Sequence, residues 1–512
     1  MSSVAVPGAS AAPSAFDERA FRKRIPFPER SPEYGVYLSL IKVLRARKAS
    51  DKPRILVITD IEQDYDDLMA IVFLSEMHRL GAVELAGFIA NHGKPETRAK
   101  FLRTIVNLLG LGHLPVAEGT IGVEDQSKKV WIDDSYYELK NITFAEQPWN
   151  NEPFQKGIDL IEQLVQEVDQ GKEPLTVLLI SSLQDISEYF DRHKGEKSFL
   201  QSHFKKFVSQ GGYEVKENAD GSCVLEPIMG MANNGWHPTA ARNFTNCLVE
   251  YDLPSDAWSR EAAKEARLDG GTFADLAPFG PIGAHLSWLY RRQEFKFYWD
   301  PFNAPYLPRL NAEWYLKTRL VLDPKSKIFS EFKKSPPTFE KVLPLTKVIA
   351  YDGCAAMGAV GDDVMRALGI MDENLPNYNQ ASHRHRVFGR GERDLGGIDG
   401  AKLGETFKIF FLGALRATKA NAEKLIPSSS VRHQEVKYDV SLDVFDKQIP
   451  YLRQSKELAD EARQGNQESQ RKLEQLKAAK LDGADREFPK VPEPEDIPYE
   501  LLYQAAIHGA HY

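Results

Sequence analysis

A short acidic segment has the clearest capacity for chemistry in this 512-residue sequence, with carboxylates at Asp60, Glu62, Asp64, Asp66 and Asp67. Carboxylates packed so closely repel one another, and each close pair costs on the order of a few kcal/mol at an effective dielectric constant of about 20. A bound cation would remove that cost. Oxygen ligands without cysteine favour Ca²⁺ or Mg²⁺ over zinc. We therefore expect a cation site here; the alternative is a solvated acidic loop that caps a helix.

The acidic segment follows a stretch that is typical of a buried strand. Residues 54–60 are a short apolar run that ends in an acid, as expected of a strand covered on both faces in a parallel sheet. Acids followed by good helix formers predict a helix from Asp66 to Leu74. In open α/β sheets, ligands bind beyond the carboxyl ends of the strands. The five acids are thus expected at the ligand-binding edge.

Strand and helix patterns continue to alternate along the chain. Further strands are predicted at residues 83–90, 114–117, 175–180, 224–229 and 347–352, and helices at 95–109, 158–168, 355–368 and from 184 onward. This alternation predicts an α/β protein with a mostly parallel central sheet flanked by helices, that is, a Rossmann-like core.

We expect one large domain with extensions. Residues 1–50 are predicted to be an N-terminal tail and helical extension, residues 51–430 the main domain, and residues 431–512 a charged helical extension. Within the main domain, residues 250–345 are rich in aromatic residues, Pro and Gly. They are expected to form an insertion that packs on the sheet and covers a pocket. The charged helix near 451–480 favours a solvated surface over a coiled-coil partner site.

Composition argues against several classes of function. The formal net charge of −8 disfavours a nucleic-acid polymer as partner. Cys223, Cys247 and Cys354 form no CxxC pair, which argues against a disulfide framework or a cysteine zinc site and suits a reducing compartment. No apolar run approaches the roughly 20 residues of a membrane helix, and the N-terminus lacks the features of a secretory signal. We expect a cytoplasmic protein without membrane contact.

The acidic segment resembles the N-terminal signature of the inosine–uridine-preferring nucleoside hydrolase family. That signature is D-x-D-P-G-x-D-D followed by an A-I helix, and residues 60–71 read D-I-E-Q-D-Y-D-D-L-M-A-I. Three more landmarks follow in the family's order: E-L-A-G-F-I at 84–89, the N-H-G turn at 91–93, and L-L-G-L-G-H-L-P-V-A-E-G at 108–119. With weaker matches further on, the likeness covers roughly residues 54 to 370, apart from the insertion. It implies that residues 51–430 are a nucleoside hydrolase-like catalytic domain.

The resemblance implies a Ca²⁺ ion at the bottom of the pocket, with Mg²⁺ as the second choice. By position, its ligands would be Glu62, Asp67, the backbone carbonyl of Ile180, and Asp352. The same ion would bind ribose hydroxyls and a water molecule. The implied partner is a small nucleoside-like substrate, and a homo-oligomer is compatible with the sequence.

The resemblance also implies hydrolysis of the N-glycosidic bond of a ribonucleoside or related N-riboside, a reaction of purine and pyrimidine metabolism. Carboxylates stabilise the oxocarbenium-like transition state, a cation lowers the pKa of its bound water, and Asp60 or Glu62 would take the proton. Tyr351 stands where some members carry a leaving-group acid. The substrate-binding candidates are Asp66 and Asn91 at the ribose hydroxyls, Asn234 and Asn243 on the far side of the sugar, and His237 near the base.

Three positions depart from the family pattern. Glu62 replaces Asp and moves the carboxylate by roughly one C–C bond, where a misplacement of about 1 Å can cost about 100-fold in rate. Gln63-Asp64 replaces Pro-Gly, so the loop conformation must differ. Tyr351 replaces His, and an unperturbed tyrosine pKa of about 10 makes it the poorer acid at pH 7.

Two other functions fit parts of the sequence. A haloacid-dehalogenase-type phosphatase needs two acids after the first strand, a hydroxyl after a later strand, and a further acidic pair. This set is imitated by Asp60, Glu62, Ser181 or Ser182, Asp362 and Asp363. It ranks below the hydrolase because the second acid is Glu and the acidic pair falls inside a predicted helix. The other alternative is a nucleoside hydrolase-like binding protein without catalysis.

Overall fold

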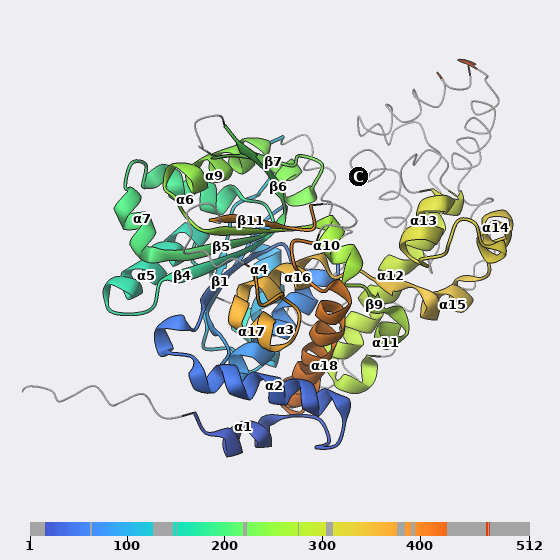
Figure 1. Ribbon diagram of the computed structural model, residues 1–512, viewed down its shortest axis with the longest axis horizontal. Coiled ribbons are helices and arrows are strands. Elements are labelled where there is room, and N and C mark those ends of the chain that lie inside the picture. Colours follow the sequence, from blue (N-terminus) through green and yellow to red (C-terminus); the bar gives the residue numbers. More distant parts are fainter. Residues whose placement is uncertain are drawn as a thin grey trace, which may run out of the picture.

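Seven parallel strands form the central sheet of the computed structural model, in the order β11-β8-β5-β4-β1-β2-β3 (Figure 1). The structure describes residues 16–61, 64–125, 147–150, 152–218, 223–274, 276–303, 311–375, 384–390 and 395–426, and residues 467, 468 and 471. The predicted α/β fold with a mostly parallel sheet is confirmed. The strands are β1 (Arg54–Thr59), β2 (Glu84–Ala90), β3 (Val116–Glu118), β4 (Leu175–Ile180), β5 (Phe204–Gly211), β8 (Ser255–Ser259) and β11 (His385–Phe388).

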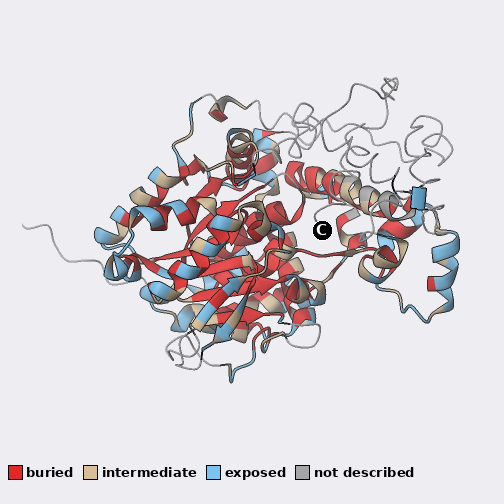
Figure 2. Ribbon diagram, turned by 90° about the horizontal axis from the view of Figure 1, so that it is seen from above, coloured by how far each residue is buried: buried red, intermediate tan, exposed pale blue. Residues whose placement is uncertain are grey.

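Both faces of this sheet are buried beneath helices (Figure 2). Successive residues of β1 point to opposite faces, so that Val57 belongs to one apolar core and Leu56 to the other. The first core is covered by α3 (Asp66–Leu80), α4 (Pro95–Leu108), α16 (Tyr351–Ala359) and α18 (Gly400–Leu425). The second is covered by α5 (Gly157–Asp169), α6 (Gln184–Arg192), α7 (Lys197–His203) and α9 (Pro238–Glu250). Among the described residues, no helix is both long and apolar enough to cross a bilayer.

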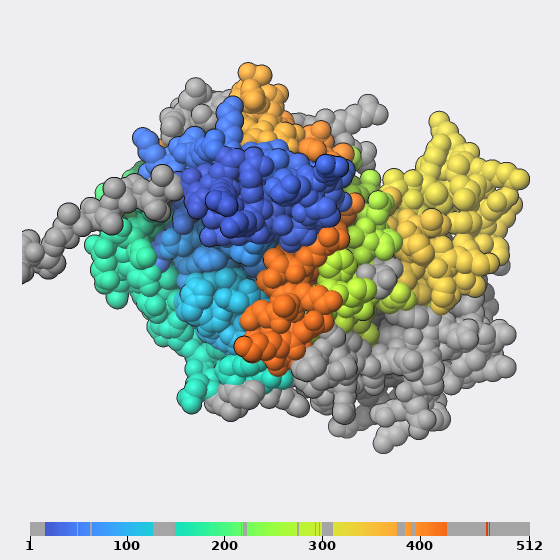
Figure 3. Space-filling view, turned by 90° about the horizontal axis from the view of Figure 1, so that it is seen from below, coloured from blue at the N-terminus to red at the C-terminus, as the bar shows by residue number. Residues whose placement is uncertain are grey.

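Helix α2 (Pro32–Ala46), which follows α1 (Glu18–Arg24), lies beside α18, as Figure 3 shows in blue and orange. The Ser31 hydroxyl caps α2 by accepting the Tyr34 N–H at 3.2 Å. Tyr37 of α2 donates to the Glu76 carboxylate of α3 at 2.6 Å, and its ring packs against Phe410 of α18. The predicted helical extension therefore shares the first core, while its boundary at residue 50 stays a prediction.

The aromatic-rich range 250–345 contains both sheet and non-sheet elements. Strand β8 lies inside the central sheet, between β5 and β11. The range continues with α10 (Arg260–Glu265), β9 (Leu268–Asp269), α11 (Gly270–Ala274), α12 (Pro281–Asn303), α13 (Ala312–Thr318), α14 (Lys327–Lys334) and α15 (Phe339–Val342). Helices α13 to α15 lie to one side of the sheet in Figures 1 and 3 rather than on its face.

Three predicted elements differ from the structure. Of the strand expected at 347–352, only β10 (Lys347–Val348) forms; it pairs with β9 outside the central sheet, and Asp352 lies in the first turn of α16 instead of at a strand end. The helix expected at 355–368 is divided between α16 and α17 (Asp362–Ala367) at Gly361, whose φ is 108°. The strand expected at 224–229 is β7 (Cys223–Pro227), which pairs with β6 (Tyr213–Glu217) in a separate hairpin.

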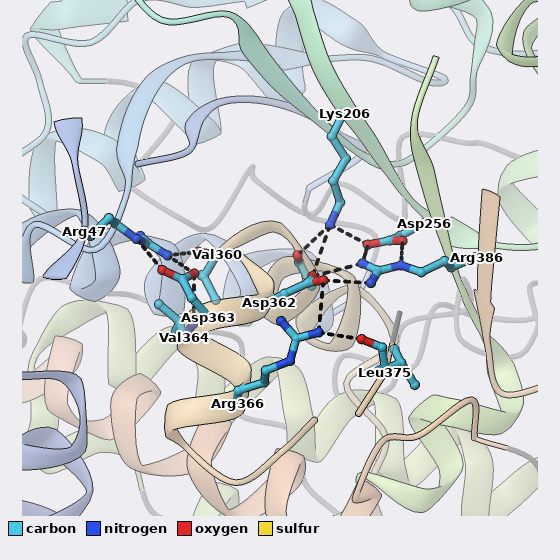
Figure 4. A network of polar contacts seen from close by, with 11 residues as sticks. Arg47, Lys206, Asp256, Val360, Asp362, Asp363, Val364, Arg366, Leu375 and Arg386 are labelled. Carbon is cyan, nitrogen blue, oxygen red and sulfur yellow. Dashed lines mark hydrogen bonds and ion pairs between the residues drawn. The ribbon is translucent and has the colours of Figure 1, made fainter. Parts of the chain in front are cut away.

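Strands β5, β8 and β11 were not predicted because each carries a charged residue. The structure pairs these charges in the interior: Arg386 of β11 donates to both oxygens of Asp256 of β8, at 2.8 and 2.9 Å (Figure 4). Lys206 of β5 forms an ion pair with Asp256, and Asp362 accepts a hydrogen bond from Arg386 at 2.7 Å. A charged residue in a buried strand is thus tolerated where its partners stand on the neighbouring strands.

Candidate metal and substrate site

The carboxyl ends of three neighbouring strands bring the predicted site residues to one edge of the sheet. Thr59, the last residue of β1, is in register with Ala90 of β2 and with Ile180 of β4. Asp60, Asn91 and Ser181 are the residues that follow these three positions, and all three are buried. This shared register explains why acids at the end of β1 meet polar residues from distant parts of the sequence.

Four carboxylates converge at this edge, from Asp64, Asp66, Asp67 and Asp352. One oxygen atom from each lies within 4.8 Å of the others. Asp66 and Asp67 stand in the first turn of α3 and Asp352 in the first turn of α16, where backbone N–H groups favour negative charge. The Tyr351 N–H donates to Asp66 Oδ2 at 3.2 Å. These four residues are called the acidic cluster below.

The four carboxylates of the acidic cluster are buried close together, which disfavours their charged forms. Burial raises the pKa of Asp66 to about 6, and burial together with neighbouring carboxylates raises the pKa of Asp64, Asp67 and Asp352 well above the usual range. Burial also raises the pKa of the adjacent Asp60 to about 6. A hard divalent cation suits this set of carboxylate oxygens and would replace the protons that burial favours.

Asp60 lies beside the acidic cluster and is held by two polar neighbours. The Arg98 guanidinium and a hydrogen bond from Ser181 oppose the rise of its pKa. Arg98 is fully buried; it donates to the carbonyl of Ile61 at 2.6 Å and to that of His92 at 2.8 Å. It thereby ties the chain after β1 to the chain after β2. Sequence reasoning missed Arg98, because one arginine in a helix pattern resembles a surface residue.

Two of the predicted metal ligands, Glu62 and Ile180, are not among the four carboxylates of the acidic cluster. Glu62 lies outside the described residues, so its roles as ligand and base stay predictions. Ile180 ends β4 opposite Thr59, whose hydroxyl donates to Asp67. Asp64 was counted among the five acids but was not assigned as a ligand, because the ligand set came from a family pattern that has Gly at this position.

The Asn91 side chain is fixed by hydrogen bonds at the same edge. Its amide donates to the Ser182 carbonyl at 2.9 Å and to the Asp185 carboxylate at 2.7 Å, while its oxygen accepts from the Ser181 hydroxyl. Asp185 in turn accepts the Thr120 N–H at 2.9 Å. Three strand ends are therefore joined by one polar network next to Asp60.

Three other substrate-binding candidates have partners within the protein. Asn234 donates to the carbonyls of Gly212 and Ile228, at 2.8 and 3.1 Å, and so supports the β6–β7 hairpin. Asn243 donates to Ser187 of α6 at 2.8 Å, which ties α9 to α6. His237 accepts the Ala240 N–H at 3.1 Å and caps α9. Their contacts with a substrate stay predictions.

Tyr351 lies next to the acidic cluster, whereas Asp362 and Asp363, the acidic pair of the phosphatase alternative, lie away from it. Tyr351 begins α16 directly before Asp352, and burial raises its pKa to about 12. Asp362 forms an ion pair with Arg386, and Asp363 forms one with Arg47 (Figure 4). The Asp362–Arg386 pair adjoins Lys206 and Asp256, near the amino ends of β5 and β8, so it lies at the opposite edge of the sheet from Asp60.

Comparison with known proteins identifies relatives of the fold. No protein family's sequence profile matches this chain, and no curated protein sequence matches it. The type III effector protein XopQ, solved with adenosine diphosphate ribose, has a TM-score of 0.58 at 18% identity over 76% of this chain and 99% of its own. The effector protein XOO4466 has a TM-score of 0.54 at 17% identity, with the same coverage. A purine-preferring ribonucleoside hydrolase from Gardnerella vaginalis has a TM-score of 0.40 at 14% identity over 71% and 99%. The two effectors show a shared fold.

Proposed function

We propose that this protein hydrolyses the N-glycosidic bond of a ribonucleoside or a related N-riboside, and that it requires a divalent cation, most readily Ca²⁺. The observation that carries the proposal is the acidic cluster, whose four carboxylates lie within 4.8 Å of one another at the ligand-binding edge of a parallel sheet. The resemblance of residues 60–71 to the nucleoside hydrolase signature supports it independently.

Asp64, Asp66, Asp67 and Asp352 are the residues that would hold the cation, with Glu62 and the Ile180 carbonyl as further ligands. When bound, the cation lowers the pKa of a water ligand and orients ribose hydroxyls. Asp60 would serve as the proton acceptor, because its buried carboxylate lies directly after β1, beside the acidic cluster. The surrounding carboxylates stabilise the positive charge that develops on the sugar as the C–N bond breaks.

Tyr351 provides a hydrogen-bond donor for the departing base. Because burial raises its pKa to about 12, the phenol stays protonated at neutral pH and is a weak acid. Substrates whose leaving group requires little protonation are therefore expected to react fastest.

A second candidate function is binding of a ribose-containing ligand without cleavage. Two observations favour it: the weak acid at position 351, and the structural similarity to an effector solved with adenosine diphosphate ribose. In this case the acidic cluster would hold a cation that binds ribose hydroxyls, and no free sugar would form.

The experiment that tests the proposal is release of reducing sugar from a panel of purine and pyrimidine nucleosides, with Ca²⁺ or with a chelator. Asp67→Asn removes a ligand, and Asp159→Asn, at an exposed position in the first turn of α5, is the matched control. Sugar release that needs Ca²⁺ and is lost only in Asp67→Asn supports hydrolysis. Binding of adenosine diphosphate ribose without sugar release favours the second candidate, and phosphate release from a phosphoester favours the phosphatase.

A further inference from the structure

Three buried residues, Tyr65, Glu294 and Arg319, join the acidic cluster to helices α12 and α13, and we propose that they position the cluster for cation binding. Tyr65 stands between Asp64 and Asp66, Glu294 belongs to α12, and Arg319 follows α13. These three residues are called the tyrosine clamp below. The inference rests on the proposed cation site, and it assigns a positioning role to residues that are not ligands.

The geometry of the tyrosine clamp is closed, since each member contacts both others. The Tyr65 hydroxyl donates to Glu294 Oε1 at 3.4 Å and accepts from Arg319 Nη2 at 3.1 Å. Arg319 Nε donates to Glu294 Oε2 at 3.2 Å, and a second guanidinium nitrogen forms an ion pair with the same carboxylate. Glu294 is 0% exposed and Arg319 is 3% exposed.

A buried ion pair is weak support for stability, because the desolvation of two charges offsets most of their attraction. Apolar residues of similar volume would fill this space without that cost. A polar arrangement, in contrast, allows only one position for the Tyr65 hydroxyl. Since Tyr65 lies between two residues of the acidic cluster, fixing its side chain also fixes the backbone that carries Asp64 and Asp66.

The same region also holds the segment that leads to Asp352. The Arg319 carbonyl accepts the N–H of Lys347, the first residue of β10, at 2.7 Å. Tyr290 of α12 packs its ring against Tyr65, with ring centroids 5.9 Å apart, while its hydroxyl contacts Thr346. Tyr290 of α12 and Arg319 after α13 therefore contact two segments that carry the acidic cluster, at Tyr65 after β1 and at residues 346–347 before α16.

The charges of the tyrosine clamp point to the same role. Burial raises the pKa of Tyr65 and Tyr351, and the positive charge of Arg319 opposes that rise, so its field reaches the site. Glu294 balances this charge. If Glu294 became neutral, the unpaired guanidinium would repel a cation and compete with it for the carboxylates. Glu294→Gln is therefore expected to weaken cation binding although it removes no ligand.

The chain contains a matched control for these variants. Tyr37 donates to Glu76 at 2.6 Å, and Arg79 pairs with the same carboxylate at 2.5 Å, so a second tyrosine–glutamate–arginine group exists, in which Tyr37 and Glu76 are buried and Arg79 is partly exposed. It lies between α2 and the later part of α3, away from the acidic cluster. Tyr37→Phe and Glu76→Gln make the same chemical changes as Tyr65→Phe and Glu294→Gln, the loss of a hydroxyl group and the loss of a carboxylate charge.

The test is calorimetric titration of the full chain with Ca²⁺ alone, together with thermal unfolding of each variant. Outer residues that orient metal ligands typically contribute about 10- to 100-fold in metal affinity. Tyr65→Phe and Glu294→Gln are expected to weaken Ca²⁺ binding by about tenfold or more, while Tyr37→Phe and Glu76→Gln lower the melting temperature and leave the affinity unchanged. Equal Ca²⁺ affinity in all four variants would overturn the positioning role.

A second readout separates this inference from the proposed function. Hydrogen exchange of the peptide that spans residues 60–70 reports the order of the loop without any metal. Faster exchange there in Tyr65→Phe and Glu294→Gln than in the control variants supports positioning even if the protein binds no Ca²⁺, a result that would refute only the proposed function. Unchanged exchange in both clamp variants refutes positioning.

Discussion

The backbone N–H of Tyr351 donates a hydrogen bond to Asp66 Oδ2 at 3.2 Å, although the two residues stand 285 positions apart. This contact joins the first turn of α16 to the first turn of α3 and brings Asp352 to the other acids. Carboxylates from two helices therefore lie side by side, as the proposed cation site requires. Removing a carboxylate from either α3 or α16 is therefore expected to weaken cation binding. Removing an exposed carboxylate elsewhere, such as that of Asp159, is expected to leave it unchanged.

Thermal stability should depend on Ca²⁺ through Asp67. Asp67→Asn removes one charge from a buried cluster of like charges. With a chelator present, the variant is therefore expected to be as stable as the wild type or slightly more stable. The wild type should gain about 2.7 kcal/mol when free Ca²⁺ exceeds its Kd about 100-fold. Melting curves with Ca²⁺ and with chelator measure this gain. A gain of equal size in Asp67→Asn would exclude this residue as a ligand.

The pH dependence of stability has a definite sign at Asp60 and Asp66. Their pKa is raised to about 6, above the roughly 3.9 of an unfolded aspartate, so the folded state favours the protonated form. Their contribution is full below about pH 4 and is lost as pH rises through about 6. With a chelator present, the free energy of unfolding should therefore fall as the pH rises through that interval. The stability gained from Ca²⁺ should grow over the same interval. A Ca²⁺ gain that is independent of pH from 4 to 7 would contradict the pKa directions.

A histidine at position 351 is expected to speed turnover. An unperturbed imidazole has a pKa of about 6.5 and protonates a leaving base far better than a phenol whose pKa is about 12. Tyr351→His should raise kcat for purine nucleosides by roughly 100-fold, the lower end of the contribution of a general acid. Tyr351→Phe is the control. If both variants release sugar at the wild-type rate, Tyr351 does not contact the leaving group.

The charged network between β5, β8 and β11 should control stability rather than cation binding (Figure 4). Arg386→Met leaves Asp256, which is 0% exposed, without its bidentate partner. Breaking a buried pair from one side typically costs about 3–5 kcal/mol. Urea unfolding should show this loss, while Arg22→Met in the exposed pair with Glu18 changes stability by less than about 1 kcal/mol. A similarly small change in the free energy of unfolding of both variants would show that the charged network does not control stability.

The parts of the site that depend on neighbouring residues could be predicted from the sequence. The run 54–59 is apolar at every position except its ends, so its burial and the edge location of Asp60 follow from local pattern alone. The helix that begins at Asp66 follows from its acids and helix formers. The family resemblance predicted Asp352 as a metal ligand but not its location on a helix. The short apolar run within residues 347–352 is typical of a buried strand.

The parts that depend on distant partners could not be predicted. Tyr65 forms hydrogen bonds with Glu294 and Arg319, which lie 229 and 254 positions away in the sequence. A local sequence pattern cannot predict contacts at such separations. The sequence of strand β8 is not continuously apolar, because it contains Asp256. Its partner Arg386 is distant in the sequence and is brought close only by folding. Asp64 belongs to the acidic cluster, but the family pattern has Gly at this position, so the resemblance gave no reason to assign it as a ligand.

The most direct test of the central claim is calorimetric titration of Ca²⁺ into the chelator-treated protein and into Asp352→Asn. The carboxylate of Asp352 is the one contributed by a different helix, so its loss tests whether the convergence of α3 and α16 makes the site. We expect one Ca²⁺ ion per wild-type chain and at least about 10-fold weaker binding in the variant, the scale on which losses at metal sites fall. Wild-type protein that takes up no Ca²⁺, or equal binding by both proteins, would contradict a cation site formed where α3 and α16 converge.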